Sequence, residues 1–220
     1  FKNWVTNMNG KCEPMVVDAP QGERSLAEEP GFARRVTARV PWESYIPNLM
    51  FLGHRRFATS VSTMGCASAC SFCGLTKNMR GRWARPADSI IEELSYLSRK
   101  RGIRTVNFMD DNTLFAHPGD EADELLDRLI KEKLDLEWTI YLNNFEISPQ
   151  RLQRMKQAGC RRTLILTESG SQRIANLAHG REIPIDNIAN MVERVHRAGI
   201  EAGARFQIGF PSETWNDGME

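Results

Sequence analysis

The chain has 220 residues and a mass of 25.0 kDa, which is enough for one large or two small domains with a sizeable buried core. Its 29 Lys and Arg residues nearly balance its 28 Asp and Glu residues, so the formal net charge is +1, and nothing in the charge favours a nucleic acid or an anionic membrane as partner. No stretch reaches the roughly 18 uncharged apolar residues of a membrane helix, and the first residues lack the apolar run of a signal peptide. We therefore expect a cytoplasmic protein.

The sequence changes character near residue 57. Residues 1–56 show little periodic pattern and contain five prolines, so we expect an irregular linker there. From Phe57 onward, apolar β-rich runs alternate with charged segments of helical period, which predicts an α/β domain over 57–220. The chain starts on Phe rather than Met and stops on a turn that enters a helix, so we expect a piece of a longer protein whose domain is truncated at the C-terminus.

Five strands are predicted in this domain, with helices between them. The helices are indicated by apolar residues at helical spacing, by starts such as Pro86 and Ser148, and by ends such as Gly159. This alternation predicts parallel strands joined by right-handed crossovers, in an α/β barrel or an open α/β sheet. The predicted strands cover 57–63, 105–109, 137–143, 163–167 and 204–210, and the predicted helices cover 86–101, 120–133, 148–158 and 185–198.

Polar or thiol side chains follow each predicted strand. In both architectures the active site is expected at the carboxyl ends of the strands. In strand order, these positions hold Cys66, then Asp110 and Asp111, then Asn143 and Asn144, then Glu168 and Ser169, and finally Glu213.

Three of the five cysteines lie within eight residues of one another, directly after the first strand. They form the motif Cys66-x3-Cys70-x2-Cys73, whereas Cys12 and Cys160 stand alone. Such clustering in a chain expected in the cytoplasm favours a metal site over disulfides. Three thiolates can bind three irons of a [4Fe-4S] cluster and leave the fourth iron open for a substrate or cofactor, which four cysteines would not allow.

Other interpretations of the cysteines remain open. A zinc site could be completed by a histidine, by Cys12 or by Cys160, or the thiols could simply be buried. Zinc sites usually use two separate pairs of ligands, and this chain has neither a second cysteine pair nor a pair of histidines at ligand spacing. The iron–sulfur interpretation is therefore favoured. Within it, Cys12 or Cys160 could also close the fourth iron site of a non-enzymatic electron carrier.

The motif Cys66-x3-Cys70-x2-Cys73, with Phe72 before its last cysteine, resembles the signature of the radical S-adenosylmethionine (radical SAM) superfamily. The resemblance covers the chain from about residue 57 to its end, and it is closest to the branch whose members often carry a cobalamin-binding domain. Beyond the cysteines it rests on Trp138 and on the segments 85–94, 108–115, 152–160, 168–171 and 209–214, which follow in the order that the branch shows.

The resemblance implies a fold and a chemistry. The fold is a partial (βα)6 TIM-like barrel with five strands present. Cys66, Cys70 and Cys73 bind a [4Fe-4S] cluster, and S-adenosylmethionine binds its fourth iron and is cleaved reductively to a 5′-deoxyadenosyl radical. The radical serves the C–H functionalisation of a small-molecule substrate, such as methylation or cyclisation, with an electron donor such as flavodoxin or ferredoxin. The alternatives are a methylthiotransferase-like enzyme acting on RNA or protein, and the electron carrier.

The resemblance also assigns residues to S-adenosylmethionine. Asp110 and Asp111 receive the methionine ammonium, although an Asp-Asp-Asn sequence is also typical of a solvated turn. Glu168 and Ser169 contact the ribose or methionine portion, with helix capping as the alternative for Ser169. The remaining assignments are Phe72 against the adenine, Gly74 beside the cluster loop, and the backbone of Ile208 and Gly209 at the adenine, with core packing as the alternative for Ile208.

Two departures from the family pattern affect the cofactors. Relatives often have an arginine five residues after the third-strand tryptophan, where this chain has Asn143. We therefore expect that Asn143 or, in its place, Arg205 holds the methionine carboxylate. The chain contains no Asp-x-His-x2-Gly motif for cobalamin, so any cobalamin is expected to bind to a domain that precedes Phe1.

Overall fold

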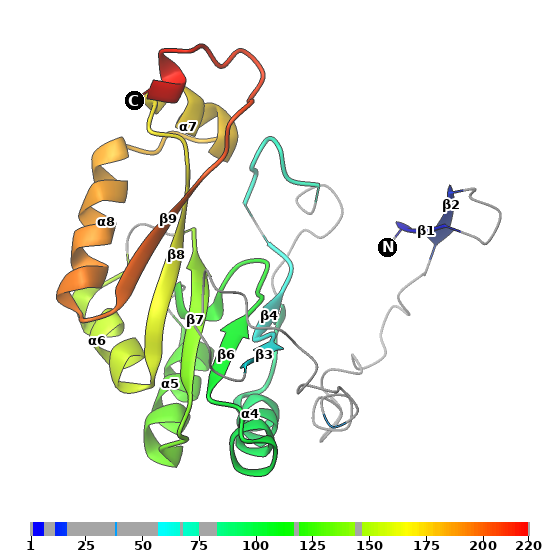
Figure 1. Cartoon of the computed structure of the whole chain (residues 1–220), viewed down its shortest axis with the longest axis vertical. Coiled ribbons are helices and arrows are strands. Elements are labelled where there is room, and N and C mark those ends of the chain that lie inside the picture. Colours follow the sequence, from blue (N-terminus) through cyan, green and yellow to red (C-terminus); the bar gives the residue numbers. More distant parts are fainter. Residues whose placement is uncertain are drawn as a thin grey trace.

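A parallel sheet of five strands in the sequential order β3-β6-β7-β8-β9 forms the centre of the fold (Figure 1). The structure is a computed structural model that describes residues 2–6, 12–16, 38, 57–66, 68–74, 83–116, 119–143 and 147–219. Each strand pairs in parallel with the next, which confirms the predicted α/β class. The strands are β3 (Phe57–Ser60), β6 (Thr105–Phe108), β7 (Glu137–Leu142), β8 (Cys160–Glu168) and β9 (Glu201–Phe206).

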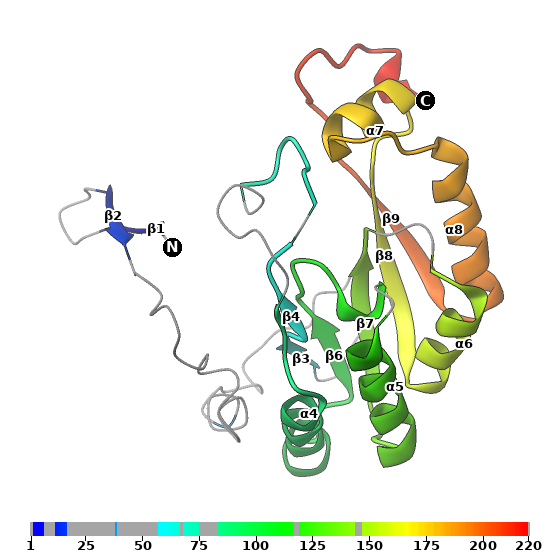
Figure 2. The ribbon, with the colours of Figure 1, turned by 180° about the vertical axis from the view of Figure 1, so that it is seen from behind.

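Helices connect successive strands of the sheet. Four of them were predicted and lie on one face of the sheet, whereas α7 was not predicted and lies beside the chain that follows β9 (Figures 1 and 2). The helices are α4 (Ala87–Arg101), α5 (Asp120–Glu132), α6 (Pro149–Gln157), α7 (Gln172–His179) and α8 (Ile185–Arg197).

Local sequence signals explain where these helices begin and end. The hydroxyl of Ser148 accepts a hydrogen bond from the backbone N–H of Arg151 at 3.2 Å, and Pro149 occupies the first helical position of α6. Gly102 ends α4 in the left-handed conformation, at φ 63°, which costs glycine nothing. The predicted boundaries of these helices are therefore correct to within about two residues.

The strand boundaries differ more from the prediction. β8 begins at Cys160, three residues before its predicted start. The prediction missed these residues because the charged Arg162 interrupts the apolar pattern near the start of the strand. Arg162 Nε donates to Glu201 of β9 at 2.8 Å. β9 correspondingly runs over Glu201–Phe206 rather than 204–210. The first predicted strand is divided into β3 and β4 (Thr63–Met64), and β4 pairs antiparallel with β5 (Trp83–Ala84).

The core between the sheet and its helices is centred on Trp138 of β7, which is 1% exposed. Its ring stacks on Phe115 with centroids 4.6 Å apart and meets the edge of Phe108 at 5.8 Å. Its Nε1 donates to the carbonyl of Ala158, at the end of α6, at 2.7 Å. Because the polar atom of the indole is satisfied, the side chain can be buried at no hydrogen-bonding cost.

Part of the segment expected to be an irregular linker is a hairpin. β1 (Lys2–Thr6) and β2 (Cys12–Val16) pair antiparallel, so the expectation of an irregular segment is wrong for these residues. The rest of residues 1–56, apart from residue 38, lies outside the described residues. Across the described parts of the chain, every helix falls short of the length and apolar character that a membrane span requires.

Candidate functional site

A cavity of about 410 Å³ lies at the carboxyl ends of the parallel strands. The sequence predicted this position from the polar side chains that follow the strands. Of the predicted site residues, the lining contains Cys66, Cys70, Phe72, Cys73, Asp110, Asp111, Asn143, Glu168 and Arg205. It also contains Ser68, Met109, Tyr141, Leu166, His179 and Arg181, which were not predicted.

The three clustered cysteines all face this cavity as free thiols. Burial raises the pKa of the Cys70 thiol, and the neighbouring thiols of Cys66 and Cys73 and the carboxylate of Glu168 raise it further. The three sulfur atoms are thus close enough to influence one another. Within the described residues, no three Cys, His, Asp or Glu side chains converge as a single metal ion would require. A [4Fe-4S] cluster does not require this, because each thiolate binds its own iron, so the donor set fits the cluster.

The loop that carries the cysteines, residues 65–74 (the cysteine loop), is held at both ends. At its start, the backbone N–H of Gly65 donates to the carboxylate of Asp111 at 2.8 Å. Near its end, the backbone N–H of Ser71 donates to the carbonyl of Ala178 in α7 at 2.9 Å. The loop therefore depends on the turn after β6 and on α7 for its position.

Asp110 fixes the chain that leads into this loop. One carboxylate oxygen accepts from the backbone N–H groups of Ser62 at 2.6 Å and Thr63 at 3.2 Å, and the other accepts from the Ser62 hydroxyl at 2.5 Å. Burial raises the pKa of Asp110, and these hydrogen bonds act in the opposite direction. Together with the bond from Gly65 to Asp111 and the burial of Asn112, this excludes the alternative of a solvated turn.

Glu168 and Arg205 form an ion pair on the wall of the cavity. Arg205 Nη2 donates to Glu168 Oε1 at 2.7 Å. Glu168 is 2% exposed and has a left-handed backbone at φ 66°, and its Oε2 has no hydrogen-bond partner among the described residues. Burial raises the pKa of Glu168, while the charge of Arg205 lowers it. The buried Oε2 of Glu168 therefore lacks a donor among the described residues. Such an oxygen suits a ligand that donates hydrogen bonds.

Four predicted site residues lie outside the cavity lining: Gly74, Ser169, Ile208 and Gly209. The Ser169 hydroxyl accepts from the backbone N–H of Ser171 at 3.1 Å, so it supports the turn before α7. Ile208 is 85% exposed, and core packing, the alternative for this residue, is therefore wrong. The backbone N–H of Gly209 donates to Glu213.

The missed residues His179 and Arg181 lie where α7 ends. His179 is its last residue and is buried, and its pKa is lowered chiefly by burial and further by the charge of Arg181. Gly180 is left-handed at φ 64°, and a β-carbon there would overlap the carbonyl oxygen of Ala69. The one local sequence signal at this corner is Gly180, a residue type common where helices end, but it indicates a helix end only once α7 itself has been recognised.

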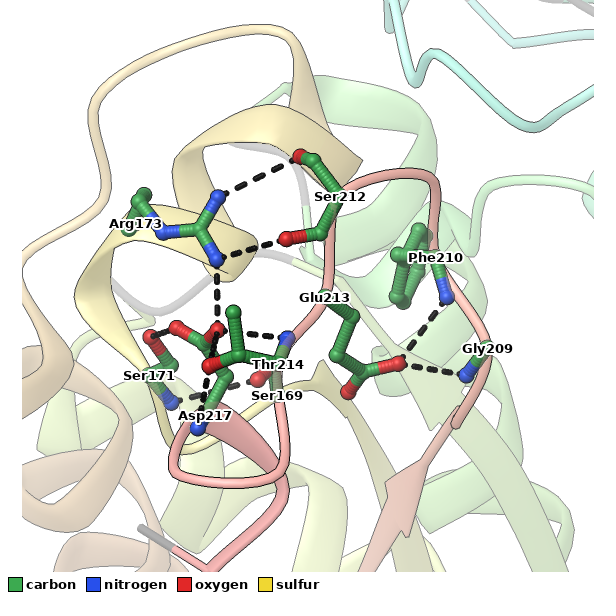
Figure 3. A network of polar contacts seen from close by, with 9 residues as sticks. All are labelled: Ser169, Ser171, Arg173, Gly209, Phe210, Ser212, Glu213, Thr214 and Asp217. Carbon is green, nitrogen blue, oxygen red and sulfur yellow. Dashed lines mark hydrogen bonds and ion pairs between the residues drawn. The ribbon is translucent and has the colours of Figure 1, made fainter.

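The chain after β9 is fastened to α7 by a network of polar contacts (Figure 3). Asp217 Oδ2 accepts from the backbone N–H of Thr214 at 2.8 Å, and its carboxylate also binds the Ser171 hydroxyl at 2.8 Å and Arg173 at 2.5 Å. The Thr214 hydroxyl, which donates to Asp217 Oδ2 at 2.6 Å, lowers the pKa of Asp217 most, and the other donors lower it further. Asp217 begins the short 3₁₀ helix η4 (Asp217–Met219), where the sequence indicated a turn entering a helix.

This network also positions an aromatic contact with the cysteine loop. Glu213 accepts from the backbone N–H of Phe210 at 2.9 Å (Figure 3). The ring of Phe210 meets the ring of Phe72 edge-on, with centroids 5.6 Å apart, and packs with Ile174 and Ala178 of α7. Phe72, between two of the cysteines, is therefore held from outside the cavity.

Parallel strands that carry a three-cysteine loop at their carboxyl ends are the architecture of a radical SAM core domain. The chain belongs to the radical SAM superfamily, whose family model it matches over residues 60–220. The five-stranded sheet is accordingly a partial TIM-like barrel, and the protein is an enzyme of this superfamily. Membership implies a [4Fe-4S] cluster and S-adenosylmethionine as its cofactors.

Relatives with curated descriptions match about seven-tenths of this chain. An uncharacterised methyltransferase of Pyrococcus horikoshii is 30% identical over 159 residues, which cover 72% of this chain and 34% of the relative. A tRNA-2-methylthio-N(6)-dimethylallyladenosine synthase of Shewanella baltica is 28% identical over 173 residues, covering 70% of this chain and 34% of the relative. The chain thus spans about a third of the length of these relatives.

Solved structures share the fold. The radical S-adenosylmethionine methyltransferase TsrM of Kitasatospora setae, solved with cobalamin and a [4Fe-4S] cluster, matches with a TM-score of 0.64 and 18% identity over 78% of this chain and 34% of its own. The cobalamin-dependent S-adenosylmethionine radical enzyme OxsB, solved with aqua-cobalamin, matches with a TM-score of 0.66 and 18% identity over 97% of this chain and 30% of its own.

Proposed function

We propose that the protein cleaves S-adenosylmethionine reductively and uses the resulting 5′-deoxyadenosyl radical for C–H functionalisation of a small-molecule substrate. The observation that carries the proposal is the meeting of three free thiols with Asp110, Asp111 and Glu168 around one cavity. Thiolates bind iron, and carboxylates bind the cationic portion of the cofactor. Both donor sets therefore lie where a cofactor could contact them together.

The residues of this chain hold and shield the reactants. Cys66, Cys70 and Cys73 bind three irons of the cluster and leave the fourth open. A reduced cluster held there would supply the one electron that reductive cleavage of S-adenosylmethionine to methionine and the 5′-deoxyadenosyl radical requires. Phe72, held by Phe210, covers the cofactor and limits the access of water.

The carboxylates of the cavity take two roles in this proposal. Asp110 and Asp111 fix the cysteine loop through backbone N–H groups, and their charge favours the methionine ammonium nearby. The unpartnered Oε2 of Glu168 accepts a hydrogen bond from the ribose or ammonium of the cofactor. Burial alone would disfavour the charge of Glu168, so Arg205 serves to keep it ionised.

The proposal includes the cobalamin-associated branch. It is supported by TsrM and OxsB, both described as radical enzymes that carry cobalamin, and by the related Pyrococcus horikoshii methyltransferase. TsrM has also been solved with its tryptophan substrate, which is a small molecule. The electron donor in this proposal is a protein such as flavodoxin or ferredoxin.

A methylthiotransferase-like activity is the second candidate. It is favoured by the Shewanella baltica relative, whose name describes a tRNA substrate. The near-zero net charge of this chain supports the small-molecule substrate instead, because enzymes that bind RNA usually present a basic surface. Incubation with small-molecule extracts and with unmodified tRNA, followed by analysis for 5′-deoxyadenosine, separates the two candidates.

The electron-carrier alternative needs a fourth thiol at the cluster. Cys160 begins β8, and at about 3.3 Å per residue it lies roughly 26 Å along the strand from Glu168 at the cavity. It is buried, and burial raises its pKa. The side chain of Cys12 lies outside the described residues. The position of Cys160 therefore supports an open fourth iron.

The test is anaerobic reconstitution with iron and sulfide, followed by EPR spectroscopy of the reduced protein with and without S-adenosylmethionine. We expect about four irons per chain, a spectrum shifted by S-adenosylmethionine, and release of 5′-deoxyadenosine. Cys70→Ala should abolish the spectrum, whereas the matched variant Cys160→Ala should keep it. An unshifted spectrum with no deoxyadenosine from the holoenzyme would overturn the proposal.

A further inference from the structure

Three apolar or aromatic side chains line the cavity below its charged groups. They come from neighbouring strands of the sheet: Met109 directly follows β6, Tyr141 lies in β7 and Leu166 lies in β8 (Figure 1). Leu166 stands two residues before Glu168, so it faces the same side of the strand and lies about 6.6 Å further from the carboxyl end. We call Met109, Tyr141 and Leu166 the apolar floor of the cavity.

Packing in the hydrophobic core does not account for the apolar floor. Each floor residue stands beside a core residue in sequence, and neighbouring residues of a strand face opposite sides of the sheet. The core residues concerned are Phe108, Ile140, Leu142 and Ile165. Among the described residues, the core includes none of the floor residues, and Met109 is 49% exposed. Apolar surface exposed inside a cavity gains free energy when a ligand covers it.

Hydrogen bonds beneath the floor fix one of its members. The hydroxyl of Thr139 donates to Asn107 Oδ1 at 2.8 Å, and Asn107 Nδ2 donates to the sulfur of Met109 at 3.0 Å. Both Thr139 and Asn107 are buried. Met109 is a flexible residue type, and this contact from a buried amide holds its thioether before any ligand arrives. A surface that is already ordered loses less entropy when it binds.

The chemistry of the floor favours an aromatic ring. A thioether makes favourable contacts with the edge of a ring, and the ring of a tyrosine packs edge-on or offset against another ring. The charges of the cavity lie nearer the carboxyl ends of the strands, where Glu168 pairs with Arg205. The floor therefore offers contacts to an uncharged ring without requiring that ring to meet a charge.

We propose that the apolar floor binds an aromatic ring of the substrate. The inference rests on the proposed function and adds to it a substrate class, a small molecule that carries an aromatic ring. The adenine of S-adenosylmethionine is the other ring expected in the cavity. The proposed function places Phe72 over the cofactor, and Phe72 belongs to the cysteine loop rather than to the strands that form the floor.

The test compares two neutral probes on the reconstituted holoenzyme saturated with S-adenosylmethionine, by anaerobic saturation-transfer NMR titration. Benzyl alcohol carries an aromatic ring, and cyclohexylmethanol is its saturated counterpart. Burial of apolar surface alone would favour the saturated ring, which is the more hydrophobic of the two. Benzyl alcohol should instead bind about threefold more tightly or better, because only an aromatic ring makes the contacts with sulfur and with the tyrosine ring.

Paired variants connect this preference to the floor. Met109→Gln and Leu166→Asn should each weaken the binding of benzyl alcohol about threefold or more. Their controls, Met219→Gln and Leu177→Asn, lie at exposed positions outside the cavity lining and should change it less than about twofold. Circular dichroism checks the folding of each variant. Met109→Gln decides the test if Leu166→Asn does not fold, because Met109 is half-exposed and lies outside the core.

Three results would overturn the inference and leave the proposed function intact. The first is equal or tighter binding of cyclohexylmethanol, or no binding of either probe. The second is displacement of benzyl alcohol by S-adenosylmethionine, which would mean that the cofactor itself covers the floor. The third is a Met109→Gln variant that weakens benzyl alcohol no more than Met219→Gln does. An EPR spectrum of the unaltered holoenzyme that S-adenosylmethionine does not shift would overturn the proposed function, and the inference with it.

Discussion

Gly180 is the residue on which the contact between α7 and the cysteine loop depends. Its backbone is left-handed at φ 64°, which costs other residues about 1–2 kcal/mol. A β-carbon would in addition overlap the carbonyl oxygen of Ala69. That oxygen belongs to the backbone between Ser68 and Cys70, so it cannot move aside without moving the cysteines. The conformation and the close approach both require glycine here.

Gly180→Ala should therefore displace the cysteine loop. We expect a loss of stability of about 2–3 kcal/mol and a clearly lower iron content after reconstitution, because the displaced carbonyl belongs to Ala69, directly before Cys70. Thermal unfolding and iron analysis measure the two effects. Gly218→Ala is the control, since its backbone is not left-handed and a β-carbon there meets no atom within 4 Å. Equal iron content in both variants would contradict the argument.

At the residue scale, the sequence predicted the site residues that lie at the carboxyl ends of strands. Cys66 and Asp110 follow strands and Glu168 ends one. Because the carboxyl ends of parallel strands meet at one edge of a sheet, it could be predicted that these residues lie together. His179 and Arg181 were missed because they reach the cavity from the end of α7, a helix that was not predicted. The ion pair between Arg205 and Glu168 could not be predicted from the sequence either, because it depends on the register between β8 and β9.

At the scale of elements, the long helices and their order were predictable, whereas α7 was not. It has eight residues, and its apolar positions, Ile174, Ala175 and Ala178, are too few to establish a helical period on their own. It is stable because its apolar side packs against Phe210, which lies more than thirty residues further along the chain. Helix propensity within a short window contains no information on such a distant contact.

Trp138 allows a prediction at the scale of elements. It joins β7 to the end of α6 through its bond to Ala158, and it joins both to Phe108 and Phe115. Trp138→Leu should lower the free energy of unfolding by about 3–4 kcal/mol, because it leaves a cavity and removes the partner of a buried carbonyl. Chemical denaturation followed by circular dichroism measures this loss.

Trp215→Leu is the matched control for the tryptophan in the core. Trp215 is 83% exposed, so its replacement should change the free energy of unfolding by less than about 0.5 kcal/mol. A similar loss in both variants would show that stability follows tryptophan content rather than burial, and the position given to Trp138 would then be wrong.

At the scale of the whole molecule, contacts between segments that are far apart in the sequence close one end of the sheet. The cysteine loop after β3 and the chain after β9 belong to the first and last strands of the sheet, and both are fastened to α7. Ser71 binds Ala178 near the end of the helix, and Asp217 binds Ser171 and Arg173 at its start (Figure 3). A substitution of Asp217 should therefore affect the cysteine loop, which is bound to the other end of α7, as well as the chain after β9.

The ionisation of Asp217 gives this fastening a defined pH dependence. Its hydrogen bonds hold the folded pKa below the unfolded value of about 3.9, so the carboxylate stabilises the fold fully above about pH 5, and this contribution is lost as the pH falls through the folded pKa. Asp217→Asn should lower the midpoint of thermal unfolding by a few degrees at pH 7, and the difference from the unaltered protein should shrink below about pH 4. Glu193→Gln, which breaks only the exposed pair with Arg197, should change the midpoint little at either pH. A difference for Asp217→Asn that persists unchanged at low pH would mean that the shape of the side chain, rather than its charge, holds the chain after β9 against α7.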